Sequence, residues 1–194
     1  MPGLSLWLSP PPNSSLNPIL TDLISTLSDT VADPPAPHFL PHITITSHIP
    51  TTSNPEEVVA FAAKYARDSQ LKIQITGLDF GPAYLKKIFL RIEKSNQLTN
   101  LAENVRRKYA CGQWYSLNDD EAAAQASEWV SSEYDPHLSL VYMDQWPLDH
   151  SQIETAEKMV DDAIVERAWY GGRIALYETQ GPADQWKMLA FVDV

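Results

Sequence analysis

The sequence has only one cysteine and few basic residues. Cys111 cannot form an intramolecular disulfide, which is consistent with a reducing compartment. We interpret it as a small buried apolar residue rather than as a nucleophile. Lys and Arg number 14 against 25 Asp and Glu, so the net charge is −11. This charge would repel a long nucleic acid, but it allows a small phosphate-bearing ligand that a few aimed donors could hold.

Long apolar runs are also missing. No stretch approaches the roughly 20 residues that a membrane-spanning helix needs, so we expect no membrane span. The start, MPGLSLWLSPPP, has no basic region before its short apolar stretch, which argues against a secretory signal. We therefore expect a cytoplasmic protein. The 194 residues fit a single domain, 1–194, and a monomer is the default expectation.

Hydrophobic periodicity predicts a chain that mixes strands and helices. A period of two or a short apolar run predicts strands at 3–9, 41–46, 71–81, 84–94, 136–143, 173–180 and 186–194. Helical spacing predicts helices at 16–29, 54–66, 97–109 and 148–168, with a second short helix near 118–129. Asn54 is expected to cap one helix, and Asp149 with Gln152 another.

The two halves of the chain repeat one order of elements. Each half has a histidine-containing strand, a helix, a strand, a Gly-Pro turn and a further strand. The turns also match in sequence, since GPAYLKKIFL starts at Gly81 and GPADQWKMLA at Gly181. This repeat predicts an α+β fold: two lobes related by a pseudo-two-fold axis, with antiparallel sheets around a central cleft and helices on the outer faces.

The histidine-containing strands are nearly the same stretch written twice. PHITIT begins at Pro41 and PHLSLV at Pro136. Because residues two apart on a strand point to the same side, His42 shares a face with Thr44, and His137 with Ser139. If the lobes are related by a two-fold axis, these faces meet in one cleft.

Such a cleft would suit chemistry at a phosphorus atom. Two imidazoles can act as general base and general acid on opposite sides of a phosphate. Two hydroxyls can hold its non-bridging oxygens as negative charge develops, and no metal or other cofactor is required. A single His-x-Thr is more often structural, but two copies with matched neighbours favour a functional site.

These paired motifs resemble those of the 2H phosphoesterase superfamily, which is named for paired His-x-Thr/Ser motifs. The chain is most similar to its fungal 2′,3′-cyclic-nucleotide 3′-phosphodiesterases, over its whole length and most visibly at LSLWLSP, PHITITS and PHLSLVY. The resemblance implies two lobes around a water-filled groove and hydrolysis of small cyclic phosphates to 2′-phosphates. It implies ADP-ribose 1″,2″-cyclic phosphate, a by-product of tRNA splicing, as a characteristic substrate, and it raises the Golgi as a second possible location.

The resemblance also implies roles for individual residues. His42 and His137 become the acid–base pair, in an order that the sequence leaves open, while Thr44 and Ser139 bind the phosphate.

Two further residues are implied at the substrate. Tyr142 is one, although strand parity places it opposite His137 unless the strand twists, bulges or ends first. Trp7 resembles the aromatic residue that related enzymes set against the base; the alternative is a half-buried core tryptophan.

Other polar groups invite other interpretations. His38, His42 and His48 could suggest a metal site, but no nearby carboxylate completes a ligand set at a familiar spacing, so we expect no metal. His150 follows a capping aspartate and is expected to be exposed in the first turn of a helix.

The basic run Arg106-Arg107-Lys108 is expected to be the solvated last turn of a helix, although a contact to a second phosphate of the substrate is conceivable.

Two alternative functions remain open. One is an RNA 3′-end-processing phosphodiesterase of the same superfamily, which the acidic balance disfavours. The other is a non-catalytic nucleotide-binding module, which the presence of both histidines and both hydroxyls disfavours. An unrelated structural α+β protein is the remaining possibility.

Overall fold

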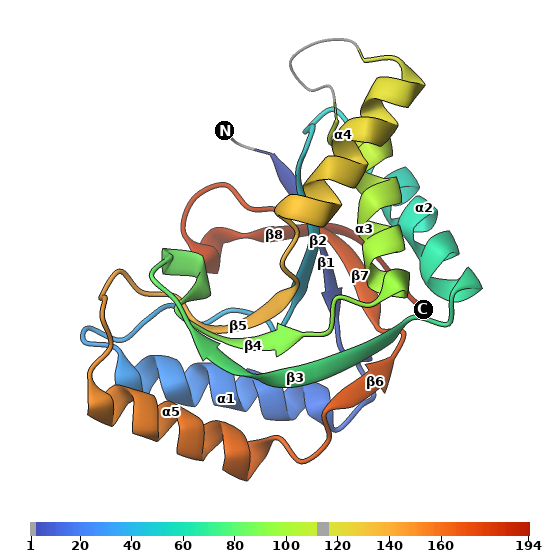
Figure 1. Cartoon of the computed structure of the whole chain (residues 1–194). Helices are drawn as coiled ribbons and strands as arrows, with labels where there is room; N and C mark the ends of the chain where they lie inside the picture. The colour runs from blue at the N-terminus through green and yellow to red at the C-terminus, as the bar shows by residue number, and fades with distance from the viewer. Residues whose placement is uncertain (1–2, 112–116) are drawn as a thin grey trace.

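A computed structural model describes residues 3–111 and 117–194 of the chain (Figure 1). The strands are β1 (Leu4–Ser9), β2 (Ile43–Ile49), β3 (Lys72–Phe80), β4 (Ile88–Ile92), β5 (His137–Val141), β6 (Ala168–Tyr170), β7 (Arg173–Glu178) and β8 (Lys187–Asp193). The helices are α1 (Leu16–Val31), α2 (Pro55–Asp68), α3 (Asn96–Tyr109), α4 (Asp119–Ser132) and α5 (His150–Ala163), with 3₁₀ turns η1 (Tyr84–Lys86) and η2 (Ala183–Gln185). The fold is α+β, as the sequence predicts.

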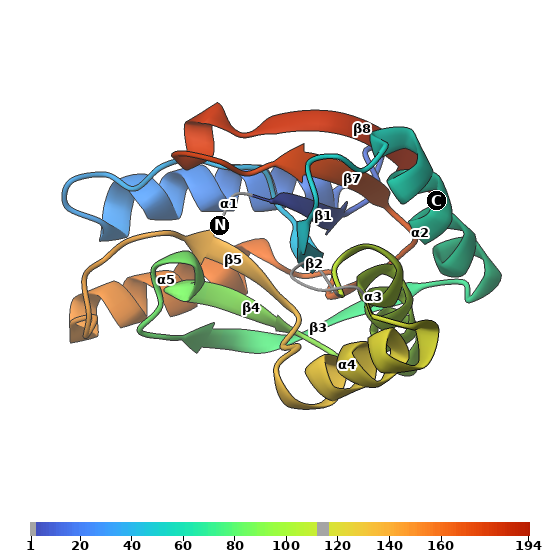
Figure 2. The ribbon, with the colours of Figure 1, turned by 90° about the horizontal axis from the view of Figure 1, so that it is seen from above.

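The strands form one antiparallel sheet in the order β6-β3-β4-β5-β2-β1-β7-β8. This order divides at the β5–β2 pair into two four-stranded halves. Each half therefore begins, at the middle of the sheet, with the strand that carries or follows one of the histidines. Figures 1 and 2 show the sheet curled, with the two halves facing one another.

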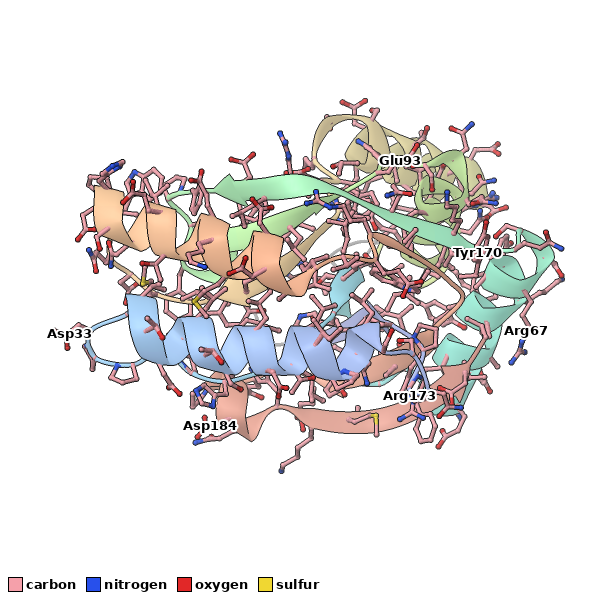
Figure 3. The ribbon with its side chains drawn as sticks, turned by 90° about the horizontal axis from the view of Figure 1, so that it is seen from below. Asp33, Arg67, Glu93, Tyr170, Arg173 and Asp184 are labelled. Atoms are coloured by element: carbon pink, nitrogen blue, oxygen red, sulfur yellow. The ribbon has the colours of Figure 1, made fainter. Side chains whose placement is uncertain are left out.

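Helices cover the outer side of the curled sheet. α1 packs on β5 and lies beside α5, whereas α2 packs on β7 and β8 and α3 on β2 (Figures 2 and 3). The apolar side of α1 meets the sheet through Leu20, Ile24 and Leu27, which are fully buried. Within residues 3–111 and 117–194, no helix has both the length and the apolar character that crossing a membrane demands.

The predicted helix starts are confirmed. The Asn54 side chain accepts hydrogen bonds from the backbone N–H groups of Glu56 and Glu57 at 3.0 and 3.2 Å. Asp149 and Gln152 form a reciprocal capping box, with both hydrogen bonds at 2.9 Å. The Gln152 amide also donates to the Val31 carbonyl at 2.6 Å, so this one side chain joins the start of α5 to the end of α1.

Several predicted boundaries differ from the structure. The strand expected at 84–94 is shorter, because Tyr84–Lys86 form η1 and β4 begins at Ile88. The helix expected to reach residue 168 ends at Ala163, and the chain then forms β6 at the edge of the sheet. Trp169 is paired with Ile73 of β3 and is buried, so packing an indole and closing a strand edge outweigh continuation of the helix. The short helix expected near 118–129 is a full helix, α4, whose capping box starts at Asn118.

The repeated Gly-Pro turns occupy equivalent ends of β3 and β7, but they lead to different places. β4 turns inward, between β3 and β5, whereas β8 turns outward and forms an edge of the sheet. The position equivalent to β4 in the other half is held by β1. The two hairpins are thus not spatial copies, although the turns themselves are. In both, the N–H of the fifth residue after the glycine, Lys86 or Trp186, bonds to an alanine carbonyl, Ala83 or Ala183.

Candidate active site

The register of the two central strands places both motifs side by side. Ile43 on β2 pairs with Leu138 on β5, so His42 lies opposite Ser139, and Thr44 lies opposite His137. Directly opposed residues have Cβ atoms roughly 4.5–5.5 Å apart. Ile43 and Leu138 point into the core and are fully buried, so the four motif residues share the inner, concave face of the sheet.

The same kind of hydrogen bond orients both histidine rings. Nδ1 of His42 bonds to the Leu40 carbonyl at 2.7 Å, and Nδ1 of His137 bonds to the Asp135 carbonyl at 2.8 Å. A carbonyl oxygen only accepts, so each Nδ1 carries the hydrogen and donates it. Each neutral ring therefore keeps Nε2 as its acceptor, and Nε2 is the atom left for a substrate or water.

A proline before each histidine explains why this hydrogen bond to the backbone occurs in both motifs. Pro41 and Pro136 stand between each histidine and the residue whose carbonyl accepts. Proline fixes its own φ and confines the preceding residue to extended backbone, so it restricts where the carbonyl two residues before the histidine can point. The proline of each PH pair thus orients an imidazole.

The surroundings of the two imidazoles differ. Burial lowers the pKa of His42 to about 4, against the opposing effect of its bond to Leu40, and the neighbouring His137 lowers it further. The pKa of His137 is also lowered, mainly by burial, with a further contribution from the Lys86 ammonium. His42 is 6% exposed, whereas His137 is only partly buried. Both rings are therefore neutral in the free protein at pH 7.

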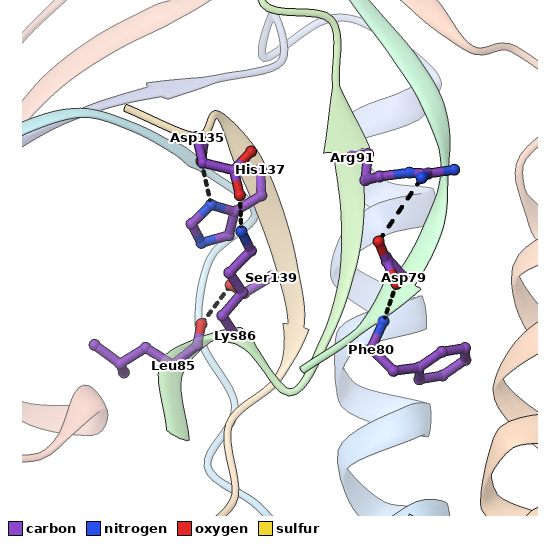
Figure 4. A network of polar contacts seen from close by, with 8 residues as sticks. All are labelled: Asp79, Phe80, Leu85, Lys86, Arg91, Asp135, His137 and Ser139. Carbon is purple, nitrogen blue, oxygen red and sulfur yellow. Dashed lines mark hydrogen bonds and ion pairs between the residues drawn. The ribbon is translucent and has the colours of Figure 1, made fainter. Parts of the chain in front are cut away.

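The hydroxyls of the two motifs are not equivalent either. Ser139 donates to the Leu85 carbonyl in η1 at 2.6 Å (Figure 4). Thr44 is partly exposed, and its hydroxyl has no hydrogen-bond partner among the residues that the structure describes. Thr44 is therefore open to a ligand, whereas Ser139 also anchors the turn that follows β3.

Tyr142 reaches the site in the way that strand parity requires. β5 ends at Val141, so the next residue is free of the strand's alternation. The Tyr142 ring is 3% exposed and stacks on Phe39 with centroids 3.8 Å apart. Its hydroxyl has the Ser139 side chain as a hydrogen-bond partner, and burial raises its pKa well above the usual range. Tyr142 thus contacts the Ser139 hydroxyl of the second motif.

The role expected for Trp7 does not fit this geometry. One face of the indole stacks on His42 with centroids 3.6 Å apart, and the other stacks on Tyr177 at 3.9 Å. Trp186 contacts it edge-on at 5.5 Å, and Trp7 is 4% exposed. Neither face is open to a nucleobase. The alternative interpretation, a buried tryptophan, describes it better, and its contact is with the imidazole.

Sequence reasoning missed Lys86 and Asp135, which lie beside His137. Their side chains form an ion pair (Figure 4). The Lys86 ammonium stands 4.5 Å from the centre of the Phe89 ring. The repeated turns GPAYLKKIFL and GPADQWKMLA contain a lysine at the same place, Lys87 and Lys187, six residues after the glycine, and this identity hides the position of Lys86. Lys87 is fully buried and donates to the Pro82 carbonyl at 2.9 Å, whereas Lys187 is exposed. The two matched lysines, Lys87 and Lys187, therefore do not share a structural role.

The other histidines do not gather around His42. His38 pairs with Asp29 at 2.9 Å, and the ring of His48 contacts the Ser47 side chain. Among the residues that the structure describes, no three His, Cys, Asp or Glu side chains are grouped as a metal site would require. His150 is exposed, as expected, and pairs with Glu154 at 3.1 Å.

The basic run of α3 is less solvated than expected. Arg106 is half-buried, donates to the Thr46 hydroxyl at 3.3 Å and stacks over Trp129 of α4. The other two cations also have partners: Arg107 bonds to Asp119, and Lys108 lies 4.1 Å from the centre of the Phe61 ring. These contacts hold α3 to its neighbours. Cys111 is partly buried, which raises the pKa of its thiol and disfavours the thiolate.

Comparison with known proteins agrees with this geometry. A family model described as "Cyclic phosphodiesterase-like protein" matches residues 1–194. Proteins named 2′,3′-cyclic-nucleotide 3′-phosphodiesterase from Yarrowia lipolytica and Phaeosphaeria nodorum are 30% and 31% identical to this chain. The alignments cover 98% of this chain and 99% and 98% of those proteins.

Solved structures show the same fold at lower identity. The crystal structure of E. coli LigT complexed with 3′-AMP has a TM-score of 0.55 and 12% sequence identity, and the match covers 100% of this chain and 98% of that one. The apo form of LigT has a TM-score of 0.52.

The curled sheet with one His-x-Thr/Ser motif from each half defines a 2H phosphoesterase fold. Within that class, the chain belongs to the cyclic phosphodiesterase-like family.

Proposed function

We propose that this protein is an enzyme that hydrolyses small 2′,3′-cyclic nucleotides to nucleoside 2′-phosphates. The observation that carries the proposal is the pairing of β2 with β5, in which the histidine of each motif lies opposite the hydroxyl residue of the other. Fungal relatives that align over nearly the whole chain are named for this activity. ADP-ribose 1″,2″-cyclic phosphate presents the same five-membered cyclic ester, so we include it in the proposed substrate class.

The reaction proceeds as follows in this proposal. Nε2 of one imidazole takes a proton from water while the water oxygen bonds to phosphorus. The bond from phosphorus to the 3′ oxygen then breaks, and Nε2 of the other imidazole gives this oxygen a proton. Thr44 donates to a non-bridging oxygen as its negative charge grows, and Ser139 does so by turning its hydroxyl from the Leu85 carbonyl to the phosphate. The products are a 2′-phosphate and a free 3′-hydroxyl.

The unequal burial of the rings suggests which histidine is the base. Burial lowers the pKa of His42 to about 4, so this ring stays unprotonated down to acidic pH and is assigned as the base. His137 is assigned as the acid, because its ring is less completely buried. An anionic phosphate bound between the rings raises the pKa of both, which makes the acid easier to keep protonated in the complex.

The test of this function is turnover of 2′,3′-cyclic AMP in EDTA. The purified protein is expected to give 2′-AMP as its product at a rate that EDTA does not change, because the described side chains carry out every proton transfer. Phosphorus NMR distinguishes the 2′ from the 3′ isomer. A 3′-AMP product, or activity that needs an added metal, would contradict the proposed mechanism.

The pH dependence of kcat/KM is expected to be bell-shaped with an acidic optimum. Activity rises with pH as His42 loses its proton, near its pKa of about 4. It falls as His137 loses its proton, at a pKa below the ordinary 6.5. The profile of kcat/KM reports the free enzyme, so its optimum lies below pH 6.5. Initial rates at low substrate concentration measure it, and a flat profile from pH 4 to 8 would contradict the assignment.

A further inference from the structure

The two halves of the site differ in charge at one pair of equivalent positions. The fifth residue after the glycine is Lys86 in the first Gly-Pro turn and Trp186 in the second, and the same backbone hydrogen bond holds each. Trp186 packs on Trp7, which stacks on His42. Lys86 instead brings an ammonium into the neighbourhood of His137. One imidazole therefore has aromatic neighbours, and the other has a cation beside it.

Two contacts position the Lys86 ammonium, one with the Phe89 ring and one with the Asp135 carboxylate. Phe89 lies under it, 4.5 Å from the ring centre, and the same ring meets His137 edge to face at 5.6 Å. Phe89 is also the partner of Ser139 in the β4–β5 register. The ammonium thus borders the same patch of the concave face as His137 and Ser139, as Figure 4 shows.

Asp135 couples this ammonium to the imidazole. Its backbone carbonyl accepts from Nδ1 of His137, and its carboxylate pairs with Lys86. The Leu85 carbonyl, next to Lys86 in the chain, accepts from Ser139. The turn η1 is therefore fastened to the second motif by two side chains. Lys86 is largely buried, with 24% of its side chain exposed, whereas the Asp135 side chain is 71% exposed.

The other charged groups around His137 are less suited to bind an anion there. Arg91 lies opposite His137 in the register, but its guanidinium extends across Gly77 toward Asp79, 3.8 Å away (Figure 4). His42, which also lies near His137, is neutral at pH 7. Lys86 is the permanent cation whose contacts place it at the patch.

We propose that Lys86 binds the phosphate of the substrate, with Asp135 holding its ammonium beside His137 until the anion arrives. The phosphate then takes one of the hydrogen bonds of the ammonium, and the exposed carboxylate of Asp135 remains in water. This inference rests on the proposed function, and it adds a cationic ligand to the two hydroxyls. A bound phosphate gains most from a cation that is already oriented and partly desolvated.

Equilibrium binding of 2′-AMP tests the proposal without requiring turnover. Lys86→Met is expected to weaken binding by roughly 10- to 100-fold, as the loss of a charged hydrogen bond does. The matched control is Lys94→Met, which removes the same charge from an exposed residue beyond the other end of β4 and is expected to leave binding unchanged. Calorimetry at constant ionic strength measures all variants.

Asp135→Asn separates phosphate binding from a merely structural ion pair. It breaks the same ion pair as Lys86→Met but keeps the ammonium and removes a negative charge, so 2′-AMP is expected to bind at least as tightly as to the unsubstituted protein. If both variants weaken binding equally, Lys86 only fastens the turn and the proposal is wrong. Unchanged binding in Lys86→Met would also overturn it.

The ring of His137 gives an independent readout. Removing the Lys86 charge is expected to raise the pKa of His137, because the imidazolium loses a neighbouring cation. Proton NMR of the histidine rings, with His137→Ala for assignment, follows this shift, and no shift would contradict the placement of the ammonium. Failure of the proposed function is visible separately, as a protein that binds 2′-AMP but does not hydrolyse 2′,3′-cyclic AMP.

Discussion

His42→Ala and His137→Ala are each expected to lower kcat for 2′,3′-cyclic AMP by roughly 100- to 10,000-fold, the range that general acid–base catalysis supplies. Each variant lacks the imidazole that would carry out one of the two proton transfers. The hydroxyls and Lys86 remain to bind the substrate. KM is therefore expected to change much less than kcat. Single-turnover rates in EDTA measure the effect directly.

The double variant and a control make this result interpretable. Because the proposed mechanism uses both imidazoles in one transition state, the double variant is expected to lose little more than either single variant. His150→Ala is the control, since that ring is exposed and pairs only with Glu154 on its own helix. Full activity in either single variant would show that the two-histidine mechanism is wrong.

Thr44→Val and Ser139→Ala are expected to reduce kcat by roughly 100- to 1,000-fold each, as the loss of one donor to a developing oxyanion does. Valine keeps the shape of Thr44 and removes only its hydroxyl. The Thr44 hydroxyl has no competing partner among the described residues, so the substitution is expected to lower kcat with little change in stability.

Ser139 is expected to differ from Thr44 in a measurable way. Ser139→Ala also releases the Leu85 carbonyl and with it the turn that carries Lys86, so KM is expected to rise as well. Thr46→Val is the matched control on β2, because its hydroxyl bonds to Arg106 rather than facing the block of four motif residues. An unchanged kcat in Thr44→Val would remove this hydroxyl from the mechanism.

The parts of the site that local rules govern could be predicted from the sequence. Alternation along a strand placed His42 with Thr44 and His137 with Ser139, and the repeated motifs implied that the two pairs meet. Which residues of the two motifs lie opposite one another depends on the strand register, in which Ile43 pairs with Leu138. This register joins segments that are far apart in the chain. Periodicity carries no information about that register.

The surroundings of each histidine could not be predicted, because they come from tertiary packing. Nothing in LSLWLSP shows that both faces of Trp7 are covered by His42 and Tyr177. Tyr142 was expected on the far side of its strand, and it reaches Ser139 only because β5 ends one residue earlier. Lys86 could not be predicted because its equivalent in the second turn is Trp186, a different type of residue. The equivalence is visible only in the backbone hydrogen bonds of the two turns.

The difference between Lys86 and Trp186, which occupy equivalent positions in the two turns, bears on which ester bond of the proposed substrate is opened. A pocket with true two-fold symmetry would accept a five-membered cyclic phosphate equally well when turned around, with its 2′ and 3′ oxygens exchanged, and would open either ester bond. An indole on one side and an ammonium on the other make the two orientations unequal in energy. In the proposed reaction, this difference between the two halves of the site favours one orientation of the substrate and therefore one product isomer.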